Sequence, residues 1–276
     1  MDSLISVSTA LLALTCGVWW GAGKAKLIID QKKYSEAQFT PEQLKALSVR
    51  LPYSVTAGLL FWPVMLLVAV RSWGYEPYSI PSASMEPSLL KGDFIAVEKF
   101  SYSLRDPIFR MELLRLGEPE RADVVVFKWP LYPAQHFVKR IVGLPGDTII
   151  ERDGALFVYP RCDSDRACES IVTRSELDNI EVLGAKSYRI QFDHDTKRSQ
   201  LEFWRQLNQP MGQWVVPENH YFVIGDNRFH SEDSRYWGFV PRHLMVGVAR
   251  NIIFSLERDD AVRVRTDRIG SIDMLE

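Results

Sequence analysis

The sequence predicts two N-terminal transmembrane α-helices followed by a mainly antiparallel β region, into which a β-rich subdomain is inserted. Three observations lead to this fold class. They are two long uncharged stretches near the N-terminus, short β-like runs from residue 92 onward, and a polar interruption of those runs at about 160–212. The formal net charge of −2 argues against a nucleic-acid-binding protein.

The two uncharged stretches cover residues 3–23 and 51–70. A helix of about 20 apolar residues is long enough to cross a hydrocarbon core of roughly 30 Å. A buried core helix is the alternative, but such helices seldom stay uncharged over this length. We therefore predict transmembrane helices at 1–23 and 51–71, the second kinked at Pro63.

A cleaved signal peptide is the main alternative for the first stretch. The start MDSLIS lacks the lysine or arginine of a positive n-region, and Trp19 and Trp20 stand where small residues should precede a cleavage site. A lipoprotein signal around Cys16 fares no better, because ALTC is a poor match to one. We expect the first span to be retained.

The segment between the spans, residues 24–50, carries more basic than acidic side chains. Because lysine and arginine concentrate in cytoplasmic loops, we expect this loop in the cytoplasm and residues 72–276 on the far side of the membrane. A short helix is predicted to begin at Pro41, with Thr40 as its N-cap.

Region 72–276 contains alternating or β-branched runs, among them DFIAVEKF, ADVVVFKWP, HFVKRIVG, GDTIIERDG, GALFVYP, HYFVIGD and VGVARNIIFSL. Asp153–Gly154 is a plausible hairpin turn. Turn signals recur about every dozen residues, which favours an antiparallel architecture over βαβ units. The segment MELLRLG, residues 111–117, fits either a helix or a strand.

The polar insertion contains Cys162 and Cys168 in the stretch YPRCDSDRACES. In an oxidising exterior compartment this pair predicts a disulfide that closes a small loop. Two cysteines without a histidine pair are poor zinc ligands, so a metal site is the weaker interpretation. Cys16, in the first span, has no partner in sequence.

Candidate chemistry begins at residues 78–93, where YSIPSASMEPSLLKGD places several serines directly after the second apolar stretch. A serine needs a base within hydrogen-bond reach to act as a nucleophile. The sequence has no G-x-S-x-G elbow, and none of its five histidines stands in a triad signature. His136 is the least unsuitable of them.

A lysine is the alternative base. If HFVKRIV is a strand, Phe137, Lys139 and Ile141 point to one face. Apolar neighbours would desolvate the amine and lower its pKa, and a drop of ~2–3 units corresponds to roughly 3–4 kcal/mol. On spacing alone, the interpretation that Lys139 reaches water or pairs with an acid remains ahead.

The stretch GDNRFHSEDSRYWGF, residues 225–239, predicts a tight turn after a strand. Its polar cluster fits either a solvated loop or a network that fixes catalytic groups. Together with PSASMEPSL, DVVVFKWP and FVKRIVGLPGD, it resembles the bacterial type I signal peptidase (leader peptidase) family in order and in spacing. The resemblance covers both spans and nearly all of region 72–276, and it is least specific in the insertion.

This resemblance implies a membrane-anchored serine endopeptidase with a Ser/Lys dyad. Such enzymes remove signal peptides from exported preproteins after small residues, in an Ala-X-Ala pattern. It implies a multi-pass protein of the bacterial inner membrane, with region 72–276 as a periplasmic catalytic domain. The expected partners are signal peptides, membrane lipid and, as an open alternative, the translocation channel. No nucleic acid, metal or cofactor is expected.

The resemblance also implies roles for individual residues. Ser84 resembles the nucleophile and Lys139 the general base, while the Ser82 hydroxyl and the Ser84 amide resemble an oxyanion hole. Ser231 resembles the serine that orients the lysine. The remaining implied roles are an ion pair that stiffens the loop (Asp233 and Arg235), substrate pockets (Tyr78, Ile80 and Val138) and a shield over the lysine (Phe127).

Three positions depart from the family pattern. Ala122 stands where the family favours glycine, and Phe229–His230 replaces an Asp-Asn pair. Glu232 occupies a position that is usually small, close to where Lys139 should lie. A carboxylate that faced the lysine would raise its pKa, so we expect Glu232 to point to solvent. Two other functions stay open as alternatives: a self-cleaving Ser/Lys repressor and an inactive membrane-anchored scaffold.

Overall fold

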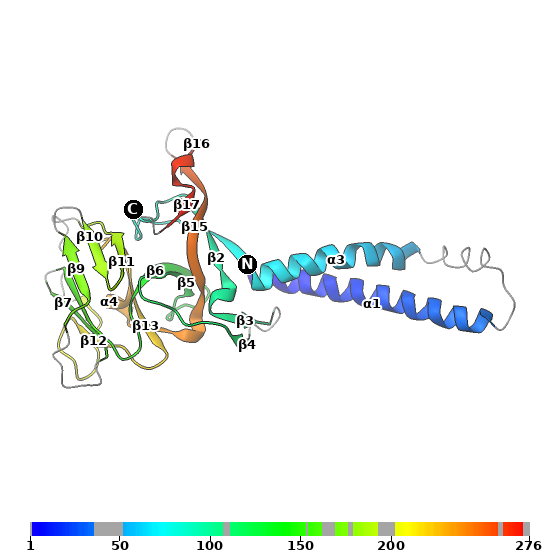
Figure 1. Ribbon diagram of the computed structural model, residues 1–276, viewed down its shortest axis with the longest axis horizontal. Helices are drawn as coiled ribbons and strands as arrows, with labels where there is room; N and C mark the ends of the chain where they lie inside the picture. The colour runs from blue at the N-terminus through cyan, green and yellow to red at the C-terminus, as the bar shows by residue number, and fades with distance from the viewer. Residues whose placement is uncertain are drawn as a thin grey trace. The chain divides into compact units, whose positions relative to one another are not determined.

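The computed structural model describes residues 2–35, 52–106, 111–152, 154–161, 169–175, 179–192, 202–258 and 262–272. The chain divides into two compact units, whose helices and strands are labelled in Figure 1. One unit comprises Met1–Gly74 and Leu104–Arg115, and the other comprises Tyr75–Ser103 and Leu116–Glu276. Each unit is considered by itself below.

The helices of the first unit are α1 (Asp2–Ser35) and α3 (Pro52–Trp73). They meet where glycines face aromatic rings, because a Cβ at Gly58 would lie only 2.5 Å from Cδ1 of Trp20. The Trp20 ring in turn stacks on Phe61, with ring centroids 5.6 Å apart. Small residues on one helix thus make room for large side chains of the other.

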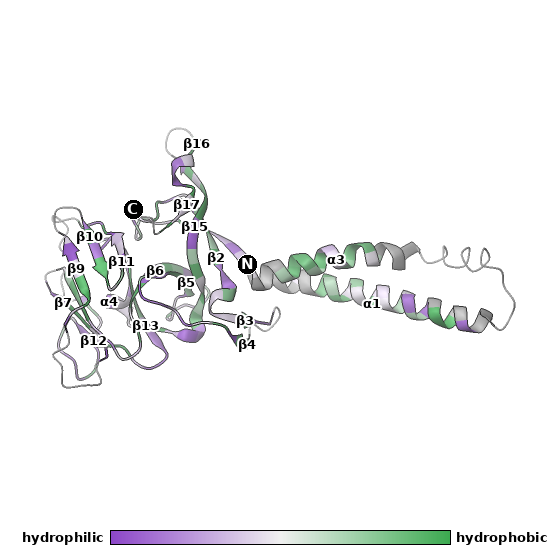
Figure 2. Cartoon of the chain, viewed as in Figure 1, coloured by the Kyte–Doolittle hydropathy of each residue, from purple (hydrophilic) through white to green (hydrophobic). Residues whose placement is uncertain are grey.

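Hydrophobic residues occur along both helices, as the colours of Figure 2 show. Exposed apolar side chains include Leu12 and Trp19 on α1 and Leu59 and Leu66 on α3. Helix α1 continues through Ser35, well past the apolar stretch of residues 3–23. In the described part of the chain, no helix combines the length and the hydropathy that are required to cross a membrane. The two predicted spans are therefore not confirmed, and the helix predicted from Pro41 lies outside the described residues.

The second unit is mainly antiparallel β, as predicted. Among the described residues, its largest sheet has the strand order β1-β2-β15-β5-β6-β13-β14, with β16 and β17 also paired to β15. The bounds are β1 (Tyr75–Ser79), β2 (Asp93–Glu98), β5 (Val124–Lys128), β6 (His136–Gly143), β13 (His220–Ile224), β14 (Val240–Pro241), β15 (Met245–Arg258), β16 (Val262–Val264) and β17 (Gly270–Ser271).

Strand β5 lies between two layers of the core, which explains its unbroken run of β-branched residues. Val124 and Val126 pack into a cluster with Ile80 and Ile95. Val125 and Phe127 pack into a different cluster, with Ile141 and Val223 of neighbouring strands. Because side chains alternate along a strand, both faces of β5 are buried, and on the adjacent strand β6 Val138 packs against the first cluster while Ile141 belongs to the second.

Two smaller sheets belong to the region between β6 and β13. One contains β7 (Thr148–Arg152), β8 (Ala155–Tyr159) and β12 (Gln213–Val215), and the other contains β9 (Val172–Ser175), β10 (Ile180–Leu183) and β11 (Lys186–Arg189). Only the second of these sheets lies within the predicted insertion, residues 160–212, and the strands of the first flank it. Strands β7 and β8 pair antiparallel with Arg152 opposite Ala155, and Gly154 has a φ of +80°. Asp153, the other residue of the predicted hairpin turn, lies outside the described residues.

The ambiguous segment 111–117 contains a strand, β4 (Glu112–Arg115), which pairs with β3 (Ser103–Arg105). Short helical turns complete the described structure: η1 (Lys99–Ser101), α4 (Ser234–Trp237), η3 (Arg242–Leu244) and η4 (Thr266–Arg268). Cys162 and Cys168 lie outside the described residues, so their disulfide stays a prediction, whereas Cys16 is a free cysteine.

Candidate active site

Ser84 lies in a tight turn that is fixed at both ends. Within the turn, the Glu86 amide donates to the Ala83 carbonyl at 3.1 Å, and the side chains of Met85 and Leu89 are buried in the core. From the segment after β13, Asn227 donates its backbone N–H to the Ser84 carbonyl at 3.2 Å and its side-chain amide to the Ala83 carbonyl at 3.1 Å. The hydroxyl of Ser84 is therefore presented from a backbone held on two sides.

Strand β6 brings Lys139 to this turn. The Lys139 Nζ lies 2.6 Å from the Ser84 Oγ, and the whole residue is only 4% exposed. Its ammonium lies over the ring of Phe137, 5.6 Å from the ring centroid, as expected for two residues on the same face of a strand. The interpretation that Lys139 reaches water, which spacing alone had favoured, is wrong because the side chain is buried.

Burial lowers the pKa of Lys139 from its ordinary 10.5 to about 8, since a dry environment penalises the charged form. Asp233, Asp226 and Glu232 oppose this change through their negative charges, and Arg235 supports it. Desolvation outweighs the carboxylates. At pH 7 roughly one amine in ten is therefore uncharged and able to accept a proton, compared with far fewer for an ordinary lysine.

Ser82 lies beside the pair on the solvent side. Its Oγ is 3.4 Å from the Ser84 Oγ, and Ser82 is an exposed residue. The second hydroxyl is thus close enough to donate to an oxygen that develops negative charge next to Ser84.

The segment after β13 contains an internal ion pair between Asp233 and Arg235. Asp233 is the N-cap of α4 and receives hydrogen bonds of 2.8 Å from Nε and Nη2 of Arg235, as well as one of 3.1 Å from the Gly225 amide. Burial alone would raise the pKa of Asp233, but the charge of Arg235 holds it below its ordinary range. The ion pair is fully formed and stiffens the turn.

Ser231 is completely buried within that turn, and its hydroxyl contributes, after Arg235 and the Gly225 amide, to lowering the pKa of Asp233. A Cβ at position 225 would lie 2.3 Å from the Ser231 Oγ and 2.4 Å from the Ser84 carbonyl oxygen. Only glycine fits between the two serines. Gly225 therefore allows the Ser231 side chain and the Ser84 backbone to share one small volume.

The three residues predicted to line substrate pockets lie together. Ile80 is buried in one apolar cluster, and Tyr78 and Val138 pack against the same cluster. His136, the alternative base, lies against the Tyr78 ring with centroids 5.5 Å apart. Phe127 belongs to the other cluster, where it contacts Phe137, and the ring beneath Lys139 is that of Phe137.

The departures from the family pattern have structural counterparts. Ala122 adopts a φ of 63°, the left-handed region that favours glycine. Phe229 packs against Phe192, with ring centroids 4.5 Å apart, and His230 Nδ1 lies 3.3 Å from Asn227 Oδ1. Glu232 is exposed, as expected, yet its charge still raises the pKa of Lys139.

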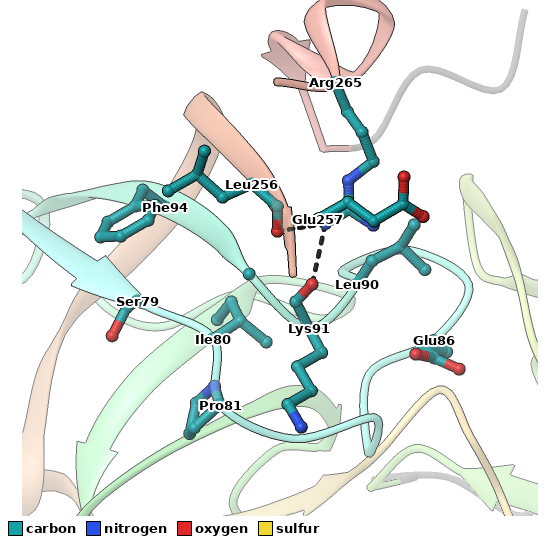
Figure 3. A pocket seen from close by; sticks show the side chains of 11 residues that line it. Ser79, Ile80, Pro81, Glu86, Leu90, Lys91, Phe94, Leu256, Glu257 and Arg265 are labelled. Atoms are coloured by element: carbon teal, nitrogen blue, oxygen red, sulfur yellow. Dashed lines mark hydrogen bonds between the residues drawn. The ribbon is translucent and has the colours of Figure 1, made fainter. Parts of the chain in front are cut away.

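A cavity of about 510 Å³ flanks the turn that carries Ser84 (Figure 3). Pro81 and Glu86, on either side of Ser84 in sequence, both line it. Arg265 closes one wall by donating to the carbonyls of Lys91 at 2.8 Å and Leu256 at 3.3 Å. Acidic and basic side chains are mixed in its lining, and the described residues contain no group of three or more metal-ligating side chains suited to hold an ion.

Some residues of the site were missed by the sequence analysis. Asn227 and Gly225 position the Ser84 backbone, and Arg140 and Asp226 form a buried ion pair close to it. Their neighbours in the sequence gave a signal, since Gly225 and Asn227 lie in the stretch GDNRFHS and Arg140 follows Lys139. The contacts themselves join distant segments and have no local signature.

Comparison with known proteins gives consistent matches. The family model for signal peptidase, peptidase S26, matches residues 54–254. Signal peptidase I of Buchnera aphidicola (from Acyrthosiphon pisum) is 32% identical over 99% of this chain and 100% of its own length. Signal peptidase I of Pseudomonas fluorescens is 40% identical over 72% of each chain, and that of Pseudomonas aeruginosa is 38% identical over 73% of this chain and 70% of its own.

Proposed function

The chain belongs to the signal peptidase family, peptidase S26, a family of serine endopeptidases, and on this premise we propose a Ser84–Lys139 dyad that removes signal peptides from exported preproteins. One observation carries the assignment of the dyad. A buried lysine with a pKa lowered to about 8 lies 2.6 Å from the hydroxyl of a half-buried serine.

The proposed reaction begins with uncharged Lys139, which accepts the Ser84 proton as the Oγ attacks the scissile carbonyl. The Ser82 hydroxyl and the Ser84 amide donate to the oxyanion, and loss of one such donor typically lowers the rate by ~10²–10³. The protonated lysine then delivers its proton to the leaving amine. Lys139 next activates a water molecule, which hydrolyses the acyl-enzyme and regenerates the serine.

Ser231, Asp233 and Arg235 support this reaction without taking part in it. The fully buried ion pair of Asp233 and Arg235 holds the turn, and Ser231 lies within the turn beside the Ser84 backbone. We assign to Ser231 the orientation of the lysine amine. Its replacement by alanine is expected to reduce the rate partially.

Substrate choice follows from the cluster that contains Tyr78, Ile80 and Val138. Ile80 is buried in this cluster, and Tyr78 and Val138 pack against it. The family resemblance implies that the three side chains line shallow substrate pockets. Shallow apolar pockets accept small residues and exclude large ones. The proposed cleavage site is therefore of the Ala-X-Ala type.

We place the protein in the bacterial inner membrane, with residues 1–23 and 51–71 as anchors, residues 24–50 in the cytoplasm and residues 72–276 on the periplasmic side. The uncharged stretches support this placement, together with the exposed apolar side chains on α1 and α3. Anchoring next to the lipid surface would raise the effective concentration of a membrane-bound signal peptide. Lipid is then a partner, and the translocation channel a candidate one.

The test uses the full chain in detergent with a preprotein that bears an Ala-X-Ala junction. Wild-type protein should cleave it at the junction, and Ser84→Ala and Lys139→Ala should each abolish cleavage. Ser79→Ala is the matched control, because Ser79 is an exposed serine in the preceding strand and should leave the rate unchanged. Persistent cleavage by Ser84→Ala would refute the dyad, and no cleavage by the wild type would favour an inactive scaffold.

A further inference from the structure

The inserted sheet of β9–β11 contributes two buried polar side chains to the core. Glu181 of β10 is 1% exposed and Tyr188 of β11 is 2% exposed. They lie opposite each other in the antiparallel register, and the Tyr188 hydroxyl donates to Glu181 Oε1 at 2.6 Å. A carboxylate is seldom buried this completely unless a cation faces it.

The cation that faces Glu181 comes from the catalytic segment. Arg228, 4% exposed, donates from Nη1 to Glu181 Oε2 at 2.7 Å and from Nη2 to Oε1. Burial alone would raise the pKa of Glu181, but the paired Arg228 holds it below its ordinary range. The Arg228 carbonyl in turn accepts a hydrogen bond of 2.7 Å from Nη2 of Arg235, the partner of Asp233.

Tyr188 makes the second connection. Its ring lies under the guanidinium of Arg140, with 4.0 Å between the guanidinium carbon and the ring centroid. Arg140 follows Lys139 on β6 and pairs with Asp226 through hydrogen bonds of 2.9 and 2.8 Å. The backbone adds to this connection, because the Gln191 amide donates to the Asp226 carbonyl at 2.9 Å.

We propose that Glu181 and Tyr188 are positioning residues for the Ser84–Lys139 pair, so that the inserted sheet forms part of the catalytic apparatus. This inference deepens the proposed function and rests on it. Glu181 fixes Arg228, and Arg228 lies in the same segment as Asn227, which holds the Ser84 carbonyl. A buried guanidinium that has lost its carboxylate moves toward water. That movement would pull residues 225–235 away from Ser84 and admit water to Lys139.

The test compares Glu181→Gln in the full chain with a matched ion pair elsewhere. Glu76 on β1 and Lys99 in η1 form a contact of 3.0 Å with side chains 9% and 7% exposed, and both lie outside residues 225–235. Glu181→Gln should lower kcat by about 10- to 100-fold while KM changes less than about twofold, since an interaction expressed in the transition state is lost. Glu76→Gln should lower the melting temperature and leave kcat unchanged.

The pH profile separates positioning from general destabilisation. If water reaches Lys139, its pKa rises toward the ordinary value, and the acid limb of kcat/KM moves to higher pH. Glu181→Gln should show this shift, whereas Glu76→Gln should not. Tyr188→Phe keeps the ring under Arg140 but removes the hydrogen bond to Glu181, so a decrease of only about two- to fivefold in kcat is expected.

Equal kcat and an equal acid limb in wild type and Glu181→Gln would overturn the inference, as would identical behaviour of Glu181→Gln and Glu76→Gln. If Glu181→Gln does not fold, Tyr188→Phe decides, and wild-type kcat in that variant refutes the positioning role. Ser84→Ala and Lys139→Ala are included in the same series. Cleavage by either of these would refute the dyad itself, which is a different failure from an inert Glu181.

Discussion

Lys139 and Arg140 are neighbours on β6 and point to opposite faces of the strand. Both are buried basic side chains, but the groups that they contact differ in charge. Both residues are almost inaccessible, at 4% and 1% exposed. Arg140 meets a carboxylate, Asp226, in a bidentate ion pair and also donates to the Ala122 carbonyl at 2.8 Å. Lys139 meets the neutral hydroxyl of Ser84 instead.

The difference shows how one strand can hold a structural cation and the proposed base on adjacent residues. A guanidinium stays protonated at any usable pH, so its burial requires a facing carboxylate and filled hydrogen bonds. An amine can release its proton instead, and desolvation drives the pKa of Lys139 to about 8 although Asp233 and Asp226 oppose it. Burial therefore favours the uncharged form of Lys139, whereas Arg140 stays charged and is neutralised by the carboxylate of Asp226.

The largest effect is expected when the lysine at position 139 is replaced by an arginine, the residue type found at position 140. Lys139→Arg should lower kcat by about 10²–10⁴-fold, the range that a general base contributes, because a guanidinium does not release its proton. Lys139→Ala should be equally inactive. Preprotein cleavage measured over a range of pH values tests this, and a kcat for Lys139→Arg within about tenfold of the wild type at any of them would remove the general-base role.

The next effect comes from depriving Arg140 of its partner. Asp226→Asn leaves a buried guanidinium without a countercharge, which should lower the free energy of unfolding by about 3–5 kcal/mol. Urea denaturation in detergent measures the change. Glu218→Gln is the control, since Glu218 pairs with Arg161 at the surface and its loss should change stability by less than about 1 kcal/mol. Equal effects of the two substitutions would contradict the structural role of Asp226.

A smaller effect is expected from Glu232, the exposed carboxylate that opposes the discharge of Lys139. Cleavage requires the uncharged amine, so the rate should fall as the pH drops through about 8, the pKa of Lys139. Glu232→Gln removes a charge that raises this pKa, and the fall should therefore occur at slightly lower pH. The difference should shrink in concentrated salt. An acid limb that moved to higher pH would contradict this sign.

The smallest effect is expected at Ala122, whose carbonyl faces Arg140. Relief of a left-handed backbone is worth about 1–2 kcal/mol, but Ala122→Gly also removes a buried methyl worth ~0.8 kcal/mol and loosens the unfolded chain by a further ~0.5–1 kcal/mol. The terms nearly cancel. We expect a net change within about 1 kcal/mol by urea denaturation, and a loss above about 2 kcal/mol would mean that the methyl packs better than its burial indicates.

The alternation of residues along β6 predicted that Lys139 and Arg140 point to opposite faces of the strand. The alternation of HFVKRIV places Lys139 beside Phe137 and Arg140 on the opposite face, because a strand repeats every two residues. What each cation meets could not be derived in this way. Ser84 and Asp226 come from distant segments, and only the family resemblance pointed to the first of them.

Two further differences have physical reasons. The polar insertion gave no sign that Glu181 would be buried, because an isolated sequence shows a charge without showing the arginine that will face it. Helix α1 continues to Ser35 because the residues after the apolar stretch, such as Lys24 and Lys26, are good helix formers. The end of an apolar stretch marks a change of surroundings and need not mark the end of a helix.

Gly225 lies between Ser84 and Ser231, with no room for a side chain of its own. A methyl group at this position would force the neighbouring atoms apart. Its nearest obstacle besides the Ser231 side chain is the Ser84 carbonyl, which belongs to the main chain and yields little. Gly225→Ala would therefore displace the nucleophile while leaving the apolar cluster around Ile80 in place. The product would be a substrate trap, able to hold a preprotein at its junction without cutting it.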